Sequence, residues 1–240
     1  MRPRANLRSV PEYVFFDFAG TLVEGVPNWE HPQIVACAEC GLTVTPAQVK
    51  EAIWKVWGPL EGCEHVEASQ DEAAYSRWIG AIERQILAGL GLPGSVLDRA
   101  ARRVMDLQVA PSSYRVYPDT IPALESLRRR GLRLGIVSNF AWRLPELVAG
   151  LGLADWFDLI LTSARVGYRK PRPEIFEHAL ATAGVAADKV LYVGDDPKCD
   201  EAGARAAGIR SLLIDRRRRA PSRGGQLRSL ATLPDHLEGG

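Results

Sequence analysis

The second half of the chain alternates short apolar segments with amphipathic ones, and this alternation restricts the possible folds more than any other feature. The apolar segments are rich in strand-forming residues and lie at 132–139, 157–163, 189–196 and 211–215. Segments of helical character accompany them at 121–131, 144–152, 173–184 and 200–208. Strands that alternate with helices predict a parallel sheet covered by helices on both faces. We therefore expect an α/β protein.

One more apolar segment, residues 13–17, predicts a strand that is far from the others in the sequence. The intervening stretch contains helix-like segments and no convincing strand; the segments lie at 31–41, 46–58, 72–91 and 95–107. On either side, residues 23–30 and 109–119 are rich in Pro, Gly or polar residues, which is typical of hinges. We therefore predict a helical domain, residues 24–111, inserted into a core made of residues 1–23 and 112–240.

The composition is ordinary for a globular protein and indicates no macromolecular partner. The chain has 240 residues, is 46% hydrophobic and carries a formal net charge of +1. A charge so close to zero gives no reason to expect binding to nucleic acid or to an anionic membrane. The N-terminal stretch MRPRANLRSVPEY is basic but lacks the apolar segment of a secretory signal. We expect a cytoplasmic protein that acts as a monomer or homodimer.

Two conspicuous groups of residues are assigned structural roles. Cys37 and Cys40 form a C-x-x-C pattern, but a structural zinc site normally needs a second close pair of ligands. We therefore expect these two cysteines to lie one turn apart on an apolar helix face. The run Arg216–Arg219 follows a predicted strand and is interpreted as a solvated surface loop.

Polar residues gather where the predicted strands end. Because ligands of open parallel sheets bind beyond the carboxyl ends of the strands, residues there are candidates for function. The residues at or just beyond these ends are Asp17, Gly20, Thr21, Ser138, Asn139, Lys170, Asp195, Asp196 and Asp200.

These residue types suit a metal ion and a phosphate group. Asp17 and Asp195 come from different strands and would repel each other unless a hard cation such as Mg²⁺ lay between them. A hydroxyl from Ser138, an amine from Lys170 and backbone N–H groups would suit a phosphate dianion. Each residue alone could instead cap a helix or lie on the surface, but their common position at successive strand ends favours a functional site.

Four sequence motifs in order resemble those of the haloacid dehalogenase-like (HAD) hydrolase superfamily. They are FFDFAGTLV, GIVSN, RKPRPEIF and YVGDDPKCD. The resemblance covers nearly the whole chain and implies a Rossmann-like core with a C1-type helical cap. It also implies a small phosphorylated metabolite as the substrate and Mg²⁺ as the cofactor.

The resemblance implies a role for each matching residue. Asp17 would be the nucleophile that forms a phospho-aspartyl intermediate, and Mg²⁺ would be bound by Asp17, Asp195 and the backbone carbonyl of Ala19. The residues implied to hold the phosphoryl group are Gly20, Thr21, Ser138, Asn139 and Lys170. Asp200 is expected to contact Lys170 without binding the metal itself, and Asp196 is a further candidate for such an outer position.

Ala19 departs from the phosphatase pattern, in which a second aspartate at this position is the general acid–base. Alanine has no proton to give, and positioned proton transfer contributes roughly 10²–10⁴-fold to a rate. The substrate could have a good leaving group, or another residue could supply the proton; the candidates are Glu24, Glu30, His31, Glu61, Glu64 and His65.

Two alternatives to a phosphatase remain. The form D-x-A-G-T resembles phosphonoacetaldehyde hydrolase, which cleaves C–P bonds with a cap lysine, here Lys50 or Lys55. Alternatively the chain could be a weak or inactive binding or regulatory relative, through natural or engineered loss of the acid. The dehalogenase branch is disfavoured because Asp195 in GDD keeps the metal-binding acid that this branch lacks.

Overall fold

A computed structural model describes residues 10–60, 63–216 and 226–237 of the chain. Three of the sequence-based interpretations concern residues outside these ranges. They are most of the basic N-terminal stretch, the candidate acid Glu61 and residues Arg217–Arg219 of the arginine run.

A five-stranded parallel sheet forms the centre of the molecule and confirms the α/β prediction. Its strand order is β5-β4-β1-β6-β7, and every neighbouring pair is parallel. The strands are β1 (Tyr13–Phe16), β4 (Arg133–Ser138), β5 (Leu159–Thr162), β6 (Val190–Gly194) and β7 (Arg210–Leu213). All residues of β1 and β6 are buried. Such burial on both faces explains why these strands are continuous apolar runs rather than alternating ones.

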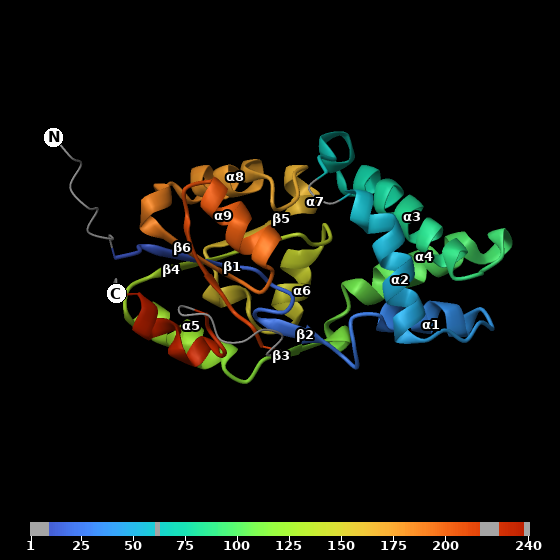
Figure 1. Ribbon diagram of the computed structural model, residues 1–240, viewed down its shortest axis with the longest axis horizontal. Helices are drawn as coiled ribbons and strands as arrows, with labels where there is room; N and C mark the ends of the chain where they lie inside the picture. Colours follow the sequence, from blue (N-terminus) through green and yellow to red (C-terminus); the bar gives the residue numbers. More distant parts are fainter. Residues whose placement is uncertain (1–9, 61–62, 217–225, 238–240) are drawn as a thin grey trace.

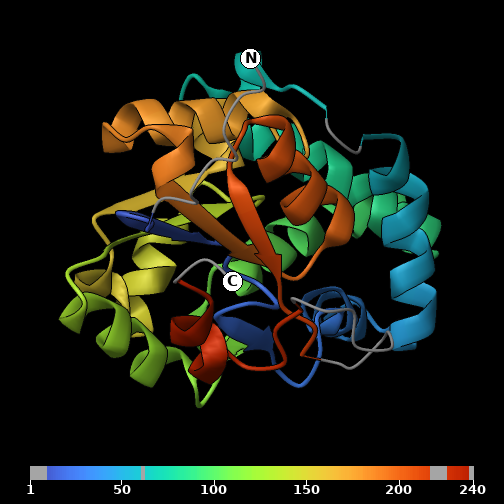
Figure 2. The ribbon, with the colours of Figure 1, turned by 60° about the vertical axis from the view of Figure 1, so that its left-hand side comes forward.

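Helices cover both faces of this sheet (Figures 1 and 2). One face packs against α5 (Thr120–Arg129), α6 (Leu144–Gly150) and the 3₁₀ segment Leu230–His236. The other face packs against α8 (Pro173–Ala183) and α9 (Gly203–Ala206), while the short α7 (Ser163–Val166) follows β5. Side chains of β1 alternate between the two faces of the sheet. Val14 and Phe16 pack into the apolar cluster on the first face, and Tyr13 and Phe15 into the cluster on the second.

The helical insertion lies at one end of the molecule (Figure 1). It consists of α1 (His31–Glu39), α2 (Pro46–Trp57), α3 (Glu72–Gly89) and α4 (Leu97–Gln108). Thr45 and Gln48 form a reciprocal capping box at the start of α2, which fixes where this helix begins. The insertion has an apolar cluster of its own, whereas a second cluster also includes Ala164 of α7 and so joins the insertion to the core.

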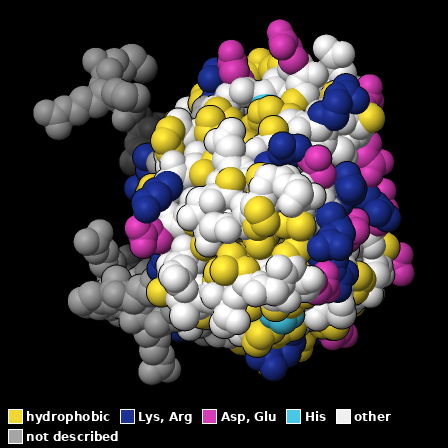
Figure 3. Space-filling model, turned by 90° about the vertical axis from the view of Figure 1, so that its right-hand side faces the viewer, with side chains coloured by type: hydrophobic (Ala, Val, Ile, Leu, Met, Phe, Trp, Pro, Cys, Tyr) yellow, Lys and Arg dark blue, Asp and Glu magenta, His cyan; other side chains and the backbone are white. Residues whose placement is uncertain are grey.

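The surface of the insertion has no uniform character (Figure 3). Charged side chains of both signs gather along one side of this face, and apolar side chains lie nearer its middle. Cys37 is buried in the apolar cluster of the insertion, and none of the four cysteines, all within the described residues, forms a disulfide. In the part of the chain that the structure describes, no helix is both long and apolar enough to span a lipid bilayer.

Three details differ from the sequence-based expectations. The predicted hinges contain a short antiparallel pair, β2 (Val23–Gly25) with β3 (Tyr114–Val116), whose three-residue strands are too short to show a periodic pattern. The predicted helix 200–208 is instead a π-helical turn, Pro197–Ala202, followed by the single turn of α9.

Arg216 is the third difference, because the prediction of a solvated loop is wrong for this residue. Its side chain is 10% exposed and forms an ion pair with Asp119 at 3.0 Å. It also donates hydrogen bonds of 2.9 and 2.6 Å to the carbonyl of Thr21 and lies over the ring of Tyr117. Arg216 therefore ties the end of the sheet to the turn that follows β1.

Candidate active site

The Asp17 carboxylate is the centre of a buried polar cluster at the carboxyl end of the sheet. Asp17 directly follows β1, and its N–H donates to the carbonyl of Val193 on β6 at 2.9 Å. Ser138, the last residue of β4, donates to Asp17 Oδ1 at 2.8 Å, and Lys170 Nζ donates to the same oxygen at 2.7 Å. Residues from three distant parts of the chain therefore meet at one oxygen atom, as expected for neighbouring parallel strands.

Lys170 is held at this position by three partners. Besides Asp17, its amine donates to Asp200 Oδ1 at 2.6 Å and to the Tyr192 hydroxyl at 2.8 Å. Burial disfavours the charged amine, but the two carboxylates outweigh this effect and hold the pKa of Lys170 above its usual value. Lys170 is therefore a permanent cation with a fixed direction, although it is only 2% exposed.

The Asp17 carboxylate is less fully compensated than its lysine partner. Burial raises the pKa of Asp17, and the ion pair with Lys170 lowers it only in part because Asp200 adds a second negative charge nearby. A single lysine thus serves two buried carboxylates. A further positive charge would therefore be stabilised in this cluster.

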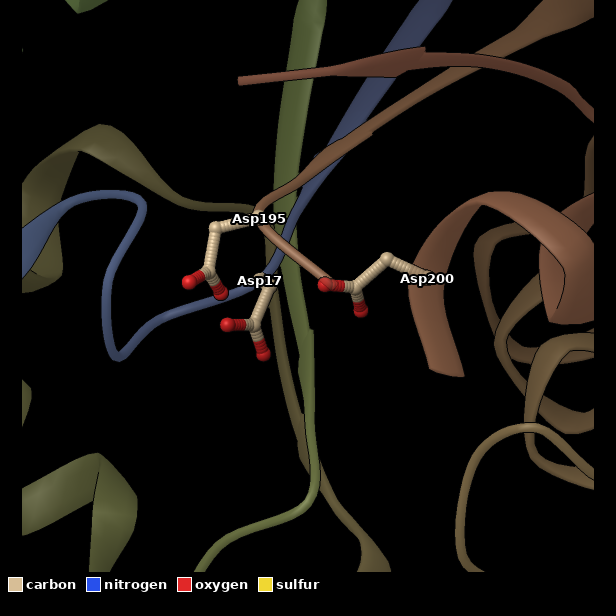
Figure 4. A group of neighbouring side chains, drawn as sticks. All are labelled: Asp17, Asp195 and Asp200. Atoms are coloured by element: carbon tan, nitrogen blue, oxygen red, sulfur yellow. The ribbon is translucent and has the colours of Figure 1, made fainter. Parts of the chain in front are cut away.

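Three carboxylates converge at this site (Figure 4). One oxygen from each of Asp17, Asp195 and Asp200 lies within 4.8 Å of the others. Asp200 is already engaged, because its Oδ1 accepts from Lys170 and its Oδ2 accepts from the N–H of Asp196 at 2.9 Å. Oxygen donors in such a group fit a hard divalent cation, and Asp17 and Asp195 are the pair best placed to bind it.

Two glycines make this convergence possible. Gly20 has a φ of +88°, and a Cβ atom there would lie 2.6 Å from Asp195 Oδ2. A Cβ atom on Gly194 would collide with the carboxyl group of Asp200. Both positions therefore require a residue without a side chain if the carboxylates are to approach one another.

The other residues predicted to hold a phosphate have different surroundings. The N–H of Gly20 donates to the carbonyl of Val23 at 2.8 Å, so this glycine shapes the turn rather than offering its N–H to a ligand. Thr21 is fully buried, and its hydroxyl has no partner among the described residues. The side-chain amide of Asn139 forms two hydrogen bonds with the backbone of Lys170, at 3.0 and 2.7 Å, and so positions the lysine.

Asp196, a candidate for an outer position of the site, caps a turn beside it. Its carboxylate accepts from the N–H groups of Lys198 and Cys199, both at 2.8 Å. It therefore caps the π-helical turn that carries Asp200.

Ala19 lies on the wall of a cavity of about 280 Å³ between the core and the insertion. Its wall is largely aromatic and apolar, with a few polar groups. Ala19, Asn139 and Arg169 of the core face Trp57, Glu83 and Gln108 of the insertion across this cavity.

The residues that the sequence suggested as substitutes for the missing acid do not line this cavity, as far as the structure describes them. Glu24 pairs with Arg115 at 2.7 Å and Glu64 with Arg172 at 3.3 Å. His65 is buried, and its Nε2 lies 3.0 Å from the carbonyl of Ser163, to which it donates. Glu30 and His31, at the start of α1, are also absent from the described lining.

Glu83, which sequence reasoning missed, is the carboxyl group that does line the cavity. It is 1% exposed and accepts from Gln33 Nε2 at 3.1 Å and from Gln108 Nε2 at 2.9 Å. Burial raises the pKa of Glu83 despite these two donors, so it keeps its proton to a higher pH than an exposed glutamate. The signal for Glu83 was its position on the apolar stripe of α3, beside Ile79 and Ile82.

The lysines required for C–P cleavage point elsewhere. Lys50 and Lys55 are exposed residues of α2, and Lys55 pairs with Glu51 at 2.8 Å. Neither lines the cavity beside Ala19. The geometry therefore gives no support to a Schiff base on either side chain.

Comparison with known proteins agrees with the fold and the motifs. The family of haloacid dehalogenase-like hydrolases matches residues 11–208. The haloacid dehalogenase-like hydrolase domain-containing protein 3 of Danio rerio is 29% identical over 233 residues, which cover 96% of this chain and 93% of the relative. Phosphoserine phosphatase of Thermus thermophilus is 34% identical over 178 residues, covering 71% and 72% of the two chains.

A solved structure extends the likeness to three dimensions. The crystal structure of a HAD phosphatase from Thermococcus onnurineus superposes with a TM-score of 0.64 at 26% identity, over 95% of this chain and 98% of that one. The matched family, the relatives named as phosphatases and the shared fold lead to one conclusion: the chain belongs to the haloacid dehalogenase-like hydrolase family and is a hydrolase of the phosphatase type.

Proposed function

We propose that the chain is a Mg²⁺-dependent phosphatase that acts on a small phosphorylated metabolite through a phospho-aspartyl intermediate on Asp17. The observation that carries this proposal is the convergence of Ser138 and Lys170 on Asp17 Oδ1. Among the described residues, both hydrogen bonds to the Asp17 carboxylate are accepted by Oδ1. The other oxygen, Oδ2, is therefore the atom left to attack the phosphorus. The relatives named as phosphatases support the same class of substrate.

The first step transfers the phosphoryl group to the protein. An Asp17 oxygen attacks phosphorus, the bond to the leaving alkoxide breaks, and an acyl phosphate forms on Asp17. Lys170 and the Ser138 hydroxyl lie where they can donate to phosphoryl oxygens as negative charge develops. Mg²⁺ bound by Asp17, Asp195 and the carbonyl of Ala19 would offset the charge that the carboxylates and the phosphate bring together.

The second step returns the carboxylate. Water attacks the phosphorus of the acyl phosphate, inorganic phosphate leaves, and Asp17 is regenerated as a carboxylate. Both steps benefit from a positioned acid–base, which Ala19 cannot provide. The cavity beside Ala19 offers Glu83, a carboxyl group whose pKa is raised by burial, and a substrate with a good leaving group would need little help in the first step.

The experiment is a phosphate-release screen over alkyl phosphates, acyl phosphates and phosphonoacetaldehyde, with and without Mg²⁺. We expect Mg²⁺-dependent release from esters or acyl phosphates by the wild type, and loss of this release in Asp17→Asn. The matched control is Asp155→Asn, because Asp155 is an exposed aspartate that belongs neither to the carboxylate cluster nor to the cavity walls. Release that survives Asp17→Asn would overturn the proposal.

The remaining outcomes separate the alternatives. Turnover confined to phosphonoacetaldehyde would indicate C–P cleavage. Binding of phosphate without turnover of any compound would indicate a regulatory or binding relative of the enzymes.

A further inference from the structure

Arg169 lies where two cavities beside the proposed nucleophile meet. One cavity, of about 220 Å³, is lined by Lys170, and the other, of about 280 Å³, is lined by Ala19. Arg169, Trp57 and Asn139 line both. Since Lys170 contacts Asp17 and Ala19 follows Asp17 by two residues, the arginine borders the space that the rest of a substrate would fill.

The guanidinium of Arg169 is held by an aromatic ring rather than by an acid. Its central carbon lies 4.4 Å from the centre of the Trp57 ring, at the end of α2 in the insertion. Stacking on an aromatic face fixes the plane of a guanidinium but leaves the N–H groups at its edge free to donate. The core thus supplies the cation and the insertion supplies the surface that orients it.

Arg169 differs in this respect from the arginines near it in sequence. Arg165 pairs with Glu146 at 3.6 Å, and Arg172 pairs with Glu174 at 2.6 Å. No such pair with a carboxylate is found for Arg169 within residues 10–60, 63–216 and 226–237. Lys170, the other cation on these walls, already serves two carboxylates. The site therefore carries one uncompensated positive charge outside the proposed phosphate position.

The surroundings of Arg169 make that charge costly without a ligand. Burial lowers the pKa of Arg169, because the guanidinium is partly withdrawn from water. The carboxyl group of Glu83 lines the same cavity, but its two oxygens accept from Gln33 and Gln108, and it forms no ion pair with Arg169 among the described residues. An anionic group on a ligand would compensate the positive charge of Arg169.

The chemistry of the site favours a carboxylate as that group. A planar guanidinium donates two parallel hydrogen bonds to a carboxylate, which matches its shape and its single negative charge. A second phosphate dianion would bring twice the charge to a single arginine. The two cavities, of about 220 and 280 Å³, limit the ligand to a small molecule.

We propose that Arg169, seated on Trp57, binds a carboxylate on the leaving group, so that the substrates are phosphomonoesters of small hydroxy acids. This assignment rests on the proposed phosphatase function of the same site. It divides recognition between two cations: Lys170 acts at the phosphate and Arg169 at the carboxylate.

The test compares two esters that differ in the carboxylate alone, phosphoglycolate and ethyl phosphate. Wild type should show a kcat/KM for phosphoglycolate that is roughly 10- to 100-fold higher, the range that a charge-assisted hydrogen bond supplies. In Arg169→Gln this ratio should fall towards one, and Arg169→Lys should keep part of it. The control is Arg165→Gln, because Arg165 is an exposed arginine on the same segment whose partner is Glu146; it should keep the ratio.

Further outcomes separate this assignment from the proposed function. Equal kcat/KM values for the two esters in wild type, or a preference that Arg169→Gln retains, would overturn the carboxylate subsite while leaving the phosphatase intact. A preference for ethylene glycol bisphosphate over phosphoglycolate would likewise overturn it. If neither ester is hydrolysed, calorimetry of the two esters with wild type and Arg169→Gln decides the question: tighter binding of phosphoglycolate that needs Arg169 supports the subsite, and its absence refutes it.

Discussion

Gly20 lies so close to Asp195 that a Cβ atom on the glycine would be 2.6 Å from the Oδ2 atom of the aspartate. Gly20→Ala would also force a residue with a side chain to adopt a φ of +88°. We expect this variant to lose roughly 1–2 kcal/mol of unfolding free energy for the backbone conformation alone. It should also lose most of its Mg²⁺ affinity, because Asp195 must move. Denaturant titration and calorimetry measure the two effects.

The control for Gly20→Ala is Gly89→Ala, at the end of α3. A Cβ atom there meets nothing within 4 Å. This substitution should leave Mg²⁺ binding unchanged and stabilise the protein by up to about 1 kcal/mol. If the two variants behaved alike, the close approach of Gly20 to Asp195 would have no functional meaning.

Asp195→Asn should weaken Mg²⁺ binding, because it removes a charged ligand from the pair that it forms with Asp17. The loss in affinity should exceed the roughly tenfold that removal of an outer partner of a metal ligand costs. Titration calorimetry measures the affinity directly. Asp196→Asn is the matched control, since the amide oxygen can still cap Lys198 and Cys199. Equal affinity in Asp195→Asn and wild type would show that the metal position is misassigned.

Ala19→Asp should raise the rate of hydrolysis of simple alkyl phosphates by roughly 10²-fold, the lower end of what general acid–base catalysis supplies. The new carboxyl group would project from the wall of a cavity of about 280 Å³, which has room for it. Acyl phosphates should gain much less, because their leaving groups need little protonation. Phosphate release from both classes of substrate is the measurement.

The control for Ala19→Asp is Ala141→Asp, which adds a carboxylate elsewhere on the same cavity wall. It should give no gain. An unchanged alkyl rate in Ala19→Asp would mean that another acid already provides the proton. In that case Glu83→Gln should lower the alkyl rate of the wild type.

His65 should make the stability of the protein depend on pH in the acidic range. Burial, together with the positive charge of Arg169, lowers the pKa of His65 from 6.5 to about 4 in the folded state. The contribution of His65 to the free energy of unfolding is therefore fully present above pH 6.5. It is lost as the pH falls towards 4, because the unfolded chain binds the proton first. The expected loss of unfolding free energy over this range is up to about 3 kcal/mol.

Denaturant titrations between pH 4 and pH 7 measure this effect. His65→Gln should flatten the pH dependence, while its amide can still donate to the carbonyl of Ser163. His178→Gln, a change at an exposed histidine of α8, should leave the pH dependence as it is. A pH profile that is the same in wild type and His65→Gln would contradict the lowered pKa.

Borohydride treatment in the presence of phosphonoacetaldehyde should trap no adduct on Lys50 or Lys55. Both amines are exposed, and Lys55 is paired with Glu51. Imine formation needs an amine that the site holds against the aldehyde, and neither lysine lines the cavity beside Ala19. Peptide mass spectrometry locates any adduct. Trapping on either lysine at a rate that matches turnover would reinstate C–P cleavage.

The sequence by itself determined the sheet and the residues at its edge. Strands buried on both faces must be continuous apolar runs, so β1 and β6 could be recognised from composition alone. Because parallel strands end at one edge, the same pattern predicted that Asp17, Ser138 and Lys170 would be neighbours. The structure places all three at one oxygen atom.

Only the tertiary structure decided what surrounds that edge. Glu83 is a buried acid because Gln33 and Gln108, far away in sequence, both donate to it. Arg169 lies over the ring of Trp57 from the insertion and forms no ion pair with a carboxylate among the described residues. Local patterns specify which residues are apolar and where strands end, whereas the partner of a charged side chain depends on which distant segments the folded chain brings within a few ångströms of it.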